Sequence, residues 1–308
     1  MQRINLRSKL VSLATLVVSL IFVSCGEYQA ILKSQDSELW FSKGMEYYAK
    51  GDYDKSANLL GGILARYAGT SKYDTIVITY ASSLVKLRDY YTAAHYYTDY
   101  VKTYPSSPKC EECQYMAGYC YYKMSPKVDL DQQDSESAIE ELSLFVNLYP
   151  ENPKVPDAER MIQEMEDKLA LKSFNSAKLY FDLGNYMGNN YQSAVITAQN
   201  CLKKFPDTKH REELCFLILE AKYIQADRST LRRQAERYRD AIDEYYSFIN
   251  EYPASKHKSD ADKIHEKSEK GLAEAERLMP PSQYDLDYYR NYGARLDAER
   301  KNLENAND

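Results

Sequence analysis

Several residue types are scarce in this chain of 308 residues. It contains one Trp, 11 Gly, 10 Pro and 6 Cys, and the scarcity of Gly and Pro excludes a collagen-like protein. Because 44% of the residues are apolar, the composition also excludes a chain that stays disordered. The 40 Lys and Arg residues are outnumbered by 46 Asp and Glu, and no basic cluster of the kind that binds phosphates is present. Nucleic acid is therefore not expected as a partner.

Motifs for catalysis and cofactor binding are also missing. The sequence has no Gly-rich phosphate loop and no His-Glu-x-x-His zinc motif. The four histidines (His95, His210, His257 and His265) have no Ser, Asp or Cys partner at a spacing that indicates a triad. The acidic residues 129–134 lack the Gly and the terminal Glu of a calcium loop, which favours a solvated loop over a cation site. We expect a binding scaffold without cofactor or metal, not an enzyme.

Residues 1–24 have the organisation of a secretory signal peptide. Basic residues without an acid precede an apolar stretch over residues 10–23, and Ser24 and Cys25 follow. This stretch is too short to span the hydrocarbon core of a bilayer comfortably. Residues 20–25 resemble the bacterial lipobox, which implies that the chain is cut before Cys25 and that Cys25 carries a diacylglycerol thioether. An ordinary signal peptide cut nearby is the alternative.

Cleavage before Cys25 would make the chain more acidic. Residues 1–24 hold three of the 40 basic residues and no acidic residue, so the net charge changes from -6 to -9. An acidic protein is repelled by anionic lipid head groups. Attachment to a membrane would therefore depend on the acyl chains.

The most informative feature of the remaining chain is a spacing that occurs five times. A small residue is followed eleven positions later by an aromatic residue, which precedes Pro in four of the five copies. The pairs are Ser56 and Tyr67, Ala93 and Tyr104, Ala138 and Tyr149, Ala194 and Phe205, and Ala241 and Tyr252. Eleven residues are about three helical turns, and Pro ends such a helix. The polar residues after Pro, such as Ser107 and Thr208, are expected to cap the next helix.

This unit of two helices resembles the tetratricopeptide repeat, a helical hairpin that stacks into a solenoid. The family positions in copy 1 are filled by Trp40, Gly44, Tyr47, Gly51, Tyr53, Ser56 and Leu60. Those in copy 2 are filled by Ala81, Leu84, Tyr90, Ala93, Tyr97, Tyr100 and Pro105. The resemblance implies an all-α solenoid of about five hairpins with a long joining helix. Within the first hairpin, Gly44 is expected to let its helix approach the second helix at Ser56.

Differences in spacing between the copies indicate how the chain is organised. Gly44 and Ser56 are 12 positions apart, whereas Gly118 and Ala138 are 20 apart, which predicts a longer loop over residues 125–134. Copy 5 is expected to carry a similar extension over residues 228–236. Residues 156–186 have apolar side chains at helical spacing, which predicts one long helix. The expected segments are a linker over 25–36, three repeats over 37–155, a joining helix with two repeats over 156–278, and a polar tail over 279–308.

The cysteine at position 25, the five repeats and the long third loop together resemble the BamD family. These are outer-membrane lipoproteins of the β-barrel assembly machine, and the resemblance covers roughly residues 25–278. It implies a lipid-anchored scaffold on the outer membrane that faces the periplasm. It also implies contact with a BamA-like β-barrel subunit that has periplasmic domains, and binding of unfolded outer-membrane protein clients. The alternatives are a generic periplasmic tetratricopeptide adaptor in cell-envelope or peptidoglycan maintenance and, more distantly, a divergent enzyme.

The tetratricopeptide resemblance also places candidate client-binding residues, because the first helix of each hairpin lines a concave groove. The candidates are Phe41, Met45, Tyr48, Lys86, Tyr115, Met116, Tyr119, Tyr122 and Lys123. Packing of the repeat does not require large apolar groups at these positions, so we expect a surface for an extended client. Lys86 and Lys123 would meet carbonyls or a terminal carboxylate. The alternative is that these aromatic residues pack beneath the long helix or a neighbouring repeat.

Cys110 and Cys113 have the C-x-x-C spacing at the expected start of a helix. A helix dipole at that position would lower a thiol pKa. No β-α-β pattern surrounds the pair, and no second pair has the spacing of a zinc site. Cys120 and Cys201 fall on apolar faces and are expected in the core. An incidental disulfide in an oxidising compartment is favoured over a redox role.

Overall fold

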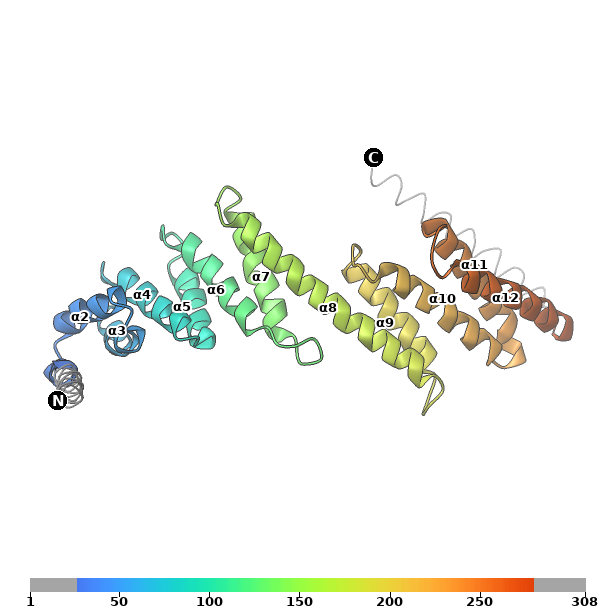
Figure 1. Cartoon of the computed structure of the whole chain (residues 1–308), viewed down its shortest axis with the longest axis horizontal. Helices are drawn as coiled ribbons and strands as arrows, with labels where there is room; N and C mark the ends of the chain where they lie inside the picture. Colours follow the sequence, from blue (N-terminus) through green and yellow to red (C-terminus); the bar gives the residue numbers. More distant parts are fainter. Residues whose placement is uncertain (1–26, 280–308) are drawn as a thin grey trace, which may run out of the picture. The chain divides into compact units, whose positions relative to one another are not determined.

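The computed structural model describes residues 27–279, which form helices α2 to α12 and contain no strand (Figure 1). The helices are α2 Ser37–Ala49, α3 Tyr53–Tyr67, α4 Tyr73–Lys86, α5 Tyr90–Thr103, α6 Cys110–Met124, α7 Gln133–Leu148, α8 Val155–Leu183, α9 Asn190–Lys204, α10 Arg211–Asp227, α11 Leu231–Glu251 and α12 Lys258–Leu278. Residues 27–34 are helical as well. The proposed signal peptide, Cys25 and the polar tail from residue 280 onward lie outside the described residues.

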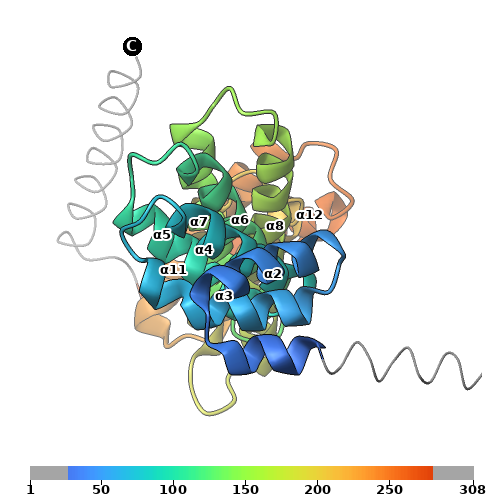
Figure 2. The ribbon, with the colours of Figure 1, turned by 90° about the vertical axis from the view of Figure 1, so that its left-hand side faces the viewer.

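Helices that follow one another in the chain pack against one another. Successive pairs from α2 to α7 are in contact, and so are those from α9 to α12. Figure 2 shows α2 and α3 of the first hairpin side by side. The described residues divide into two compact units, which meet within α8 between Glu166 and Asp167. This all-helical succession confirms the expected tetratricopeptide-like solenoid, and α8 matches the predicted long helix within three residues at its C-terminal end.

Short polar side chains set where the second helices of the hairpins begin. The Asp52 carboxylate accepts the backbone N–H of Lys55 at the start of α3, and Asp89 does the same for α5. At the start of α9 the Asn189 side chain accepts the N–H of Gln192. Such caps satisfy amide groups that have no partner inside the helix. The tight turn before Asp52 places Gly51 at a φ of +80°, where glycine has no steric penalty.

The aromatic residue before Pro ends each of four helices, as the spacing predicted. Tyr104, Tyr149, Phe205 and Tyr252 follow α5, α7, α9 and α11, with ψ between 56° and 71°. A following Pro disfavours the α conformation at these residues, which explains why each helix stops one residue earlier.

The polar residues after Pro act differently from the prediction. Lys109 and His210, not Ser107 and Thr208, are the cap residues of α6 and α10, and neither cap side chain bonds the helix. The Ser107 hydroxyl instead accepts the N–H of Lys109 at 3.2 Å, and Thr208 accepts that of His210 at 3.4 Å. These side chains therefore shape the turn before the helix, as Ser and Thr side chains commonly do.

The small residues of the first hairpin also meet partners other than those expected. A Cβ atom added to Gly44 would lie 2.6 Å from Cδ2 of Leu60, one turn beyond Ser56. Ser56 instead faces the next repeat, where it accepts a hydrogen bond of 3.2 Å from the buried Ser83 hydroxyl. The closest approach to Gly44 is therefore made by Leu60, one turn beyond the expected position at Ser56. Gly44 permits close packing inside one hairpin, and Ser56 permits it between two hairpins.

Of the two predicted insertions, only the first is a loop. α6 ends at Met124 and α7 begins at Gln133, and the buried Gln132 amide closes the loop by donating to the Lys127 carbonyl at 2.8 Å. The second is wrong, because α11 already begins at Leu231. Residues 231–236 are rich in good helix formers and extend α11 at its start. This longer helix still reaches the core, since Tyr238 is only 5% exposed.

No helix within residues 27–279 is both long enough and apolar enough to cross a bilayer.

Candidate functional site

An open cavity of about 340 Å³ lies on the first helices of the three hairpins in the first unit. Tyr48 comes from α2, Lys86 from α4, and Tyr115, Met116 and Tyr119 from α6. We call this cavity the N-terminal groove. It brings together five of the nine candidates that the sequence indicated. Its remaining wall is formed by Ser82 and Val85.

The spacing of residues along α6 explains the aromatic wall of the N-terminal groove. Tyr115 and Tyr119 are four positions apart on one helix face, and their rings are stacked with centroids 6.4 Å apart. One turn further, the Lys123 ammonium lies 5.5 Å from the centre of the Tyr119 ring and 5.8 Å from that of Tyr122. Cation–π contacts therefore keep Lys123 close to this wall.

Two tyrosines of the candidate set also bind the N-terminal part of α8. The Tyr115 hydroxyl donates to Asp157 and the Tyr122 hydroxyl to Glu164, each at 2.6 Å. Arg160 lies between the two carboxylates, 2.6 Å from Asp157 and 2.5 Å from Glu164. Tyr115 is only 7% exposed, so much of its ring belongs to the core. Tyr115 and Tyr122 therefore also pack against the long helix, as the alternative to client binding expected: Tyr115 through its buried ring and its hydroxyl, and Tyr122 through its hydroxyl.

These contacts change the pKa values of the groups involved. The pKa of Asp157 lies below its ordinary value because Tyr115 donates a hydrogen bond to the carboxylate and Arg160 stands beside it. The pKa of Tyr115 is raised, first by burial and then by its bond to Asp157. Both hydroxyl and carboxylate therefore stay in the protonation states that the hydrogen bond needs at neutral pH.

Phe41 and Met45 do not reach the N-terminal groove. Both pack against the core of the first unit, and the Phe41 ring lies 6.4 Å from that of Tyr67. The ammonium of Lys72 lies 5.2 Å from the centre of the Phe41 ring. The sequence missed Ser82 and Val85, because small and aliphatic side chains on a helix give no signal that separates a groove from a core.

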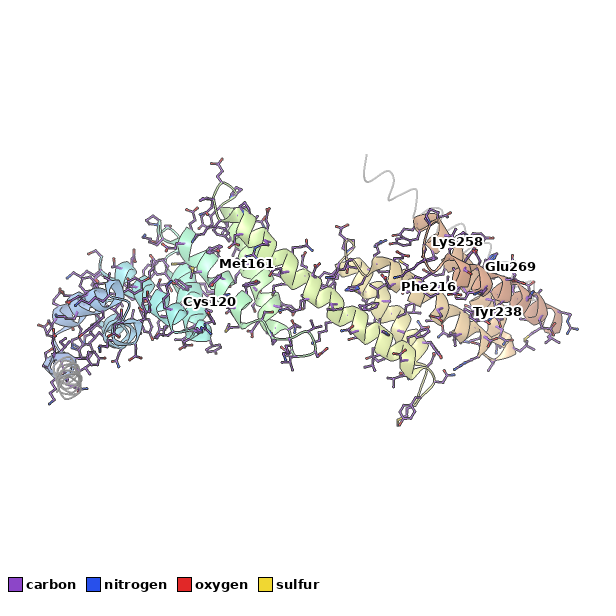
Figure 3. All side chains as sticks on the ribbon, in the orientation of Figure 1. Cys120, Met161, Phe216, Tyr238, Lys258 and Glu269 are labelled. Atoms are coloured by element: carbon purple, nitrogen blue, oxygen red, sulfur yellow. The ribbon has the colours of Figure 1, made fainter. Side chains whose placement is uncertain are left out.

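The cysteines do not form a reactive site. Cys110, Cys113, Cys120, Cys201 and Cys215 are buried and free. Burial raises the pKa of Cys113 and of Cys120 to about 12, and that of Cys110 is raised for the same reason. The expected lowering by the helix dipole is therefore wrong, because loss of hydration outweighs the dipole. Figure 3 shows Cys120 within the helices of the first unit.

The four histidines do not come together in a catalytic arrangement. His210, His257 and His265 each stack on an aromatic ring, those of Phe174, Phe216 and Tyr245. His95 is exposed. Between residues 27 and 279, no group of three or more His, Cys, Asp or Glu side chains is arranged to hold a metal ion.

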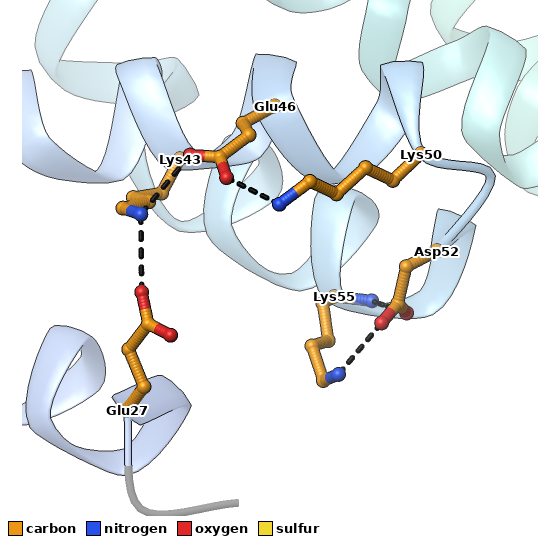
Figure 4. A network of polar contacts seen from close by, with 6 residues as sticks. All are labelled: Glu27, Lys43, Glu46, Lys50, Asp52 and Lys55. Atoms are coloured by element: carbon orange, nitrogen blue, oxygen red, sulfur yellow. Dashed lines mark hydrogen bonds and ion pairs between the residues drawn. The ribbon is translucent and has the colours of Figure 1, made fainter. Parts of the chain in front are cut away.

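The segment that follows the proposed lipidation site is fixed to the first hairpin. The Trp40 indole donates to the Ile31 carbonyl at 2.9 Å, and Ile31 itself is only 5% exposed. Figure 4 shows the polar contacts beside it, in which Lys43 lies 3.1 Å from Glu27 and 3.0 Å from Glu46. Exposed ion pairs contribute little stability, so the buried Ile31 and its bond to Trp40 dominate this attachment.

Repeated helical hairpins with an aromatic groove define the class of tetratricopeptide-type binding scaffolds. Within this class, the chain belongs to the YfiO outer membrane lipoprotein family, which it matches over residues 33–188 and 183–296. This membership confirms the resemblance that the sequence indicated. It also supports association with the outer membrane and a non-enzymatic role.

Two curated relatives carry a more specific name. The chain is 26% identical over 248 residues to the putative outer membrane protein assembly factor BamD of Aquifex aeolicus (strain VF5), covering 76% of this chain and 78% of the relative. It is 22% identical over 193 residues to the outer membrane protein assembly factor BamD of Caulobacter vibrioides, covering 62% of this chain and 61% of the relative. Among solved structures, the DHF58 filament is 14% identical and covers 83% of this chain and 97% of its own, but a TM-score of 0.15 supports no argument.

Proposed function

We propose that this chain is a scaffold of outer-membrane protein assembly that holds unfolded β-barrel clients in the N-terminal groove. It is anchored by a lipid on Cys25, faces the periplasm and docks on a BamA-like barrel subunit. Family membership and the names of both relatives support the assembly role. The observation that carries the client site is the N-terminal groove, in which aromatic, Met and Lys side chains from three hairpins meet.

The chemistry of the N-terminal groove suits an extended peptide with apolar side chains. Met116 and the tyrosine rings supply an adaptable apolar wall. The hydroxyls of Tyr115 and Tyr122 already donate to α8, whereas those of Tyr48 and Tyr119 have no hydrogen bond to any residue from 27 to 279. Tyr48 and Tyr119 are therefore the hydroxyls that would meet backbone carbonyls of a client. Lys86 is exposed at the rim and would pair with a terminal carboxylate.

The position of the anchor fits a function at a membrane. The helical segment over residues 27–34 begins two residues after Cys25 and is fixed to the first hairpin through Ile31 and Trp40. A lipid on Cys25 would therefore keep the first hairpin close to the membrane surface, because few residues remain to act as a spacer. The acidic mature chain would add no electrostatic attraction to anionic lipids.

Photocrosslinking tests the client site. A photoreactive residue replaces Tyr48 or Tyr119, and the probe is a peptide with an alternating apolar sequence and a C-terminal aromatic residue. We expect crosslinks that an excess of unlabelled peptide removes. The matched control carries the photoreactive residue at Tyr91, which is 77% exposed and lies outside the N-terminal groove. Crosslinking from Tyr91 as efficient as from Tyr48 and Tyr119, or crosslinks that unlabelled peptide does not reduce, would contradict the site.

Two further measurements test the carboxylate contact and the barrel partner. A peptide with an amidated C-terminus should bind more weakly than the free acid, and Lys86→Ala should abolish this difference. Co-purification from detergent extracts should recover a large integral β-barrel protein with the chain. Recovery of soluble periplasmic partners alone would favour the generic adaptor instead.

A further inference from the structure

A second cavity, of about 210 Å³, lies in the unit that begins at Asp167. We call it the C-terminal groove. Its apolar walls include Phe174 and Phe181 from α8 and Phe216 from α10. Like the N-terminal groove, it lies on first helices of successive hairpins. The two grooves differ in their aromatic side chains. The C-terminal groove has three phenylalanines, whereas the N-terminal groove has tyrosines and Met116.

The walls of the C-terminal groove are held by stacking. The His257 imidazole, which precedes α12, lies flat against Phe216 with ring centroids 4.3 Å apart and an interplanar angle of 11°. His210, which precedes α10, stacks in the same way on Phe174 at 4.8 Å and 10°. Each first helix thus carries a Phe that the next hairpin covers with a His. Figure 3 shows Phe216 on α10 close to the start of α12. The rings are therefore fixed before any partner binds.

The polar groups of the C-terminal groove are mostly acidic. Glu220 is half-buried and has no ion pair or hydrogen bond with any residue from 27 to 279. Burial raises the pKa of its carboxyl, and the neighbouring Asp260 adds to this effect. Glu213 is already paired with Lys256 at 2.8 Å. Asp182 and Lys178 are both exposed at the edge of the groove, so carboxylates outnumber ammonium groups there.

We propose that the C-terminal groove binds an arginine side chain of a partner protein, with the guanidinium in contact with the phenylalanine rings and donating to Glu220. A guanidinium is planar and weakly hydrated, so it combines an aromatic contact with hydrogen bonds to a carboxylate. The volume suits one large side chain. An unpaired carboxylate in an apolar wall is costly by itself, and a bound cation would offset that cost. The inference does not depend on the client site in the first unit.

The test uses the purified chain in detergent and two labelled peptides. Each peptide has one central residue flanked by alanines, either arginine or the uncharged isostere citrulline. We expect saturable binding of the arginine peptide, measured by fluorescence anisotropy, and binding at least about tenfold weaker for citrulline. Glu220→Gln should weaken the arginine peptide by a similar factor and leave the citrulline peptide unchanged.

Two controls separate recognition from folding. Glu266→Gln changes an exposed carboxylate on α12 that pairs with Lys270, and it should not change peptide binding. Glu220→Gln should unfold at no lower urea concentration than the unaltered chain, because the substitution removes a half-buried charge without a partner. Equal binding of both peptides, or an arginine peptide that binds Glu220→Gln as well as the unaltered chain, would overturn the proposal. No saturable binding of the arginine peptide would overturn it as well.

Discussion

Gly118 and Leu142 are packed so closely that a Cβ atom on the glycine would lie 2.6 Å from Cγ of the leucine and 3.1 Å from its backbone nitrogen. The same relationship joins Gly44 to Leu60 in the first hairpin. In both hairpins, the missing side chain lets a large buried leucine of the second helix fill the space between the two helices.

This contact predicts the effect of Gly118→Ala. The helices would have to separate, because the backbone of Leu142 cannot move as a side chain tip can, and we expect a cost of about 1–3 kcal/mol. The urea midpoint measures this cost. Gly61→Ala is the control, since the atoms nearest its Cβ belong to the ring of Tyr80, and the gain in helix propensity of up to about 1 kcal/mol offsets that crowding. A larger loss for Gly61→Ala than for Gly118→Ala would contradict this packing.

The small residues of the second helices give a separate prediction. Ala93 and Ala138 are fully buried, so replacing either with Leu should destabilise the chain by about 1–3 kcal/mol. Lys102→Leu on the exposed face of α5 should change stability by no more than about 0.5 kcal/mol. Lys154 is a poorer control, because its ammonium lies 4.3 Å above the Tyr115 ring. Similar urea midpoints for Ala93→Leu and Lys102→Leu would show that the helix faces are assigned incorrectly.

Thiol reactivity tests the structural role of the cysteines. Burial raises the pKa of Cys113 and Cys120 to about 12 and that of Cys215 to about 11, so few thiolates exist near pH 8. Iodoacetamide should therefore modify these cysteines only after urea unfolds the chain, as mass spectrometry would show. Rapid modification of Cys110 and Cys113 in the folded chain would instead support a redox role.

The contact of Tyr115 with Asp157 predicts a dependence on pH. The pKa of Asp157 is lower in the folded chain than its ordinary value of 3.8, so the carboxylate stabilises the fold above that pH. This stabilisation is lost as the pH falls through the lowered pKa. Tyr115→Phe should cost about 1–2 kcal/mol near pH 7 and progressively less in acid below pH 3.8. An unchanged cost across this range, measured by urea titrations, would show that the hydrogen bond is not its source.

The anchor is tested by Cys25→Ala. This substitution should release the chain into the soluble periplasmic fraction, because the proposed acyl chains on Cys25 would provide the attachment. Fractionation after high-salt and carbonate washes, together with uptake of labelled fatty acid, gives the measurement. Lipoprotein processing would be refuted by a variant that still sediments with membranes and incorporates as much fatty acid as the unaltered chain.

Local features of the sequence predicted the order of the helices and the ends of four of them. The pair of an aromatic residue and Pro ends α5, α7, α9 and α11, since Pro acts on the residue directly before it. Asp52 and Asp89 cap the starts of α3 and α5 through equally local hydrogen bonds, although the sequence pattern did not assign them. The prediction failed at residues 231–236, where the sequence is compatible with a loop or a helix. These residues extend α11 and do not form a loop.

Contacts between helices were decided by tertiary structure alone. Periodicity places Gly44 on a helix face, but only packing shows that it meets Leu60 and that Ser56 meets Ser83 in the next hairpin. The sequence placed Tyr48, Lys86 and Tyr119 on first helices, whereas the cavity that joins them depends on how three hairpins stack. The same holds for Phe216 and Glu220, because an aromatic ring and a carboxylate one turn apart look like any amphipathic helix until α8 and His257 surround them. The face of a helix on which a side chain lies follows from the helical periodicity of the sequence. The environment of that side chain depends on residues distant in the sequence, which the periodicity does not specify.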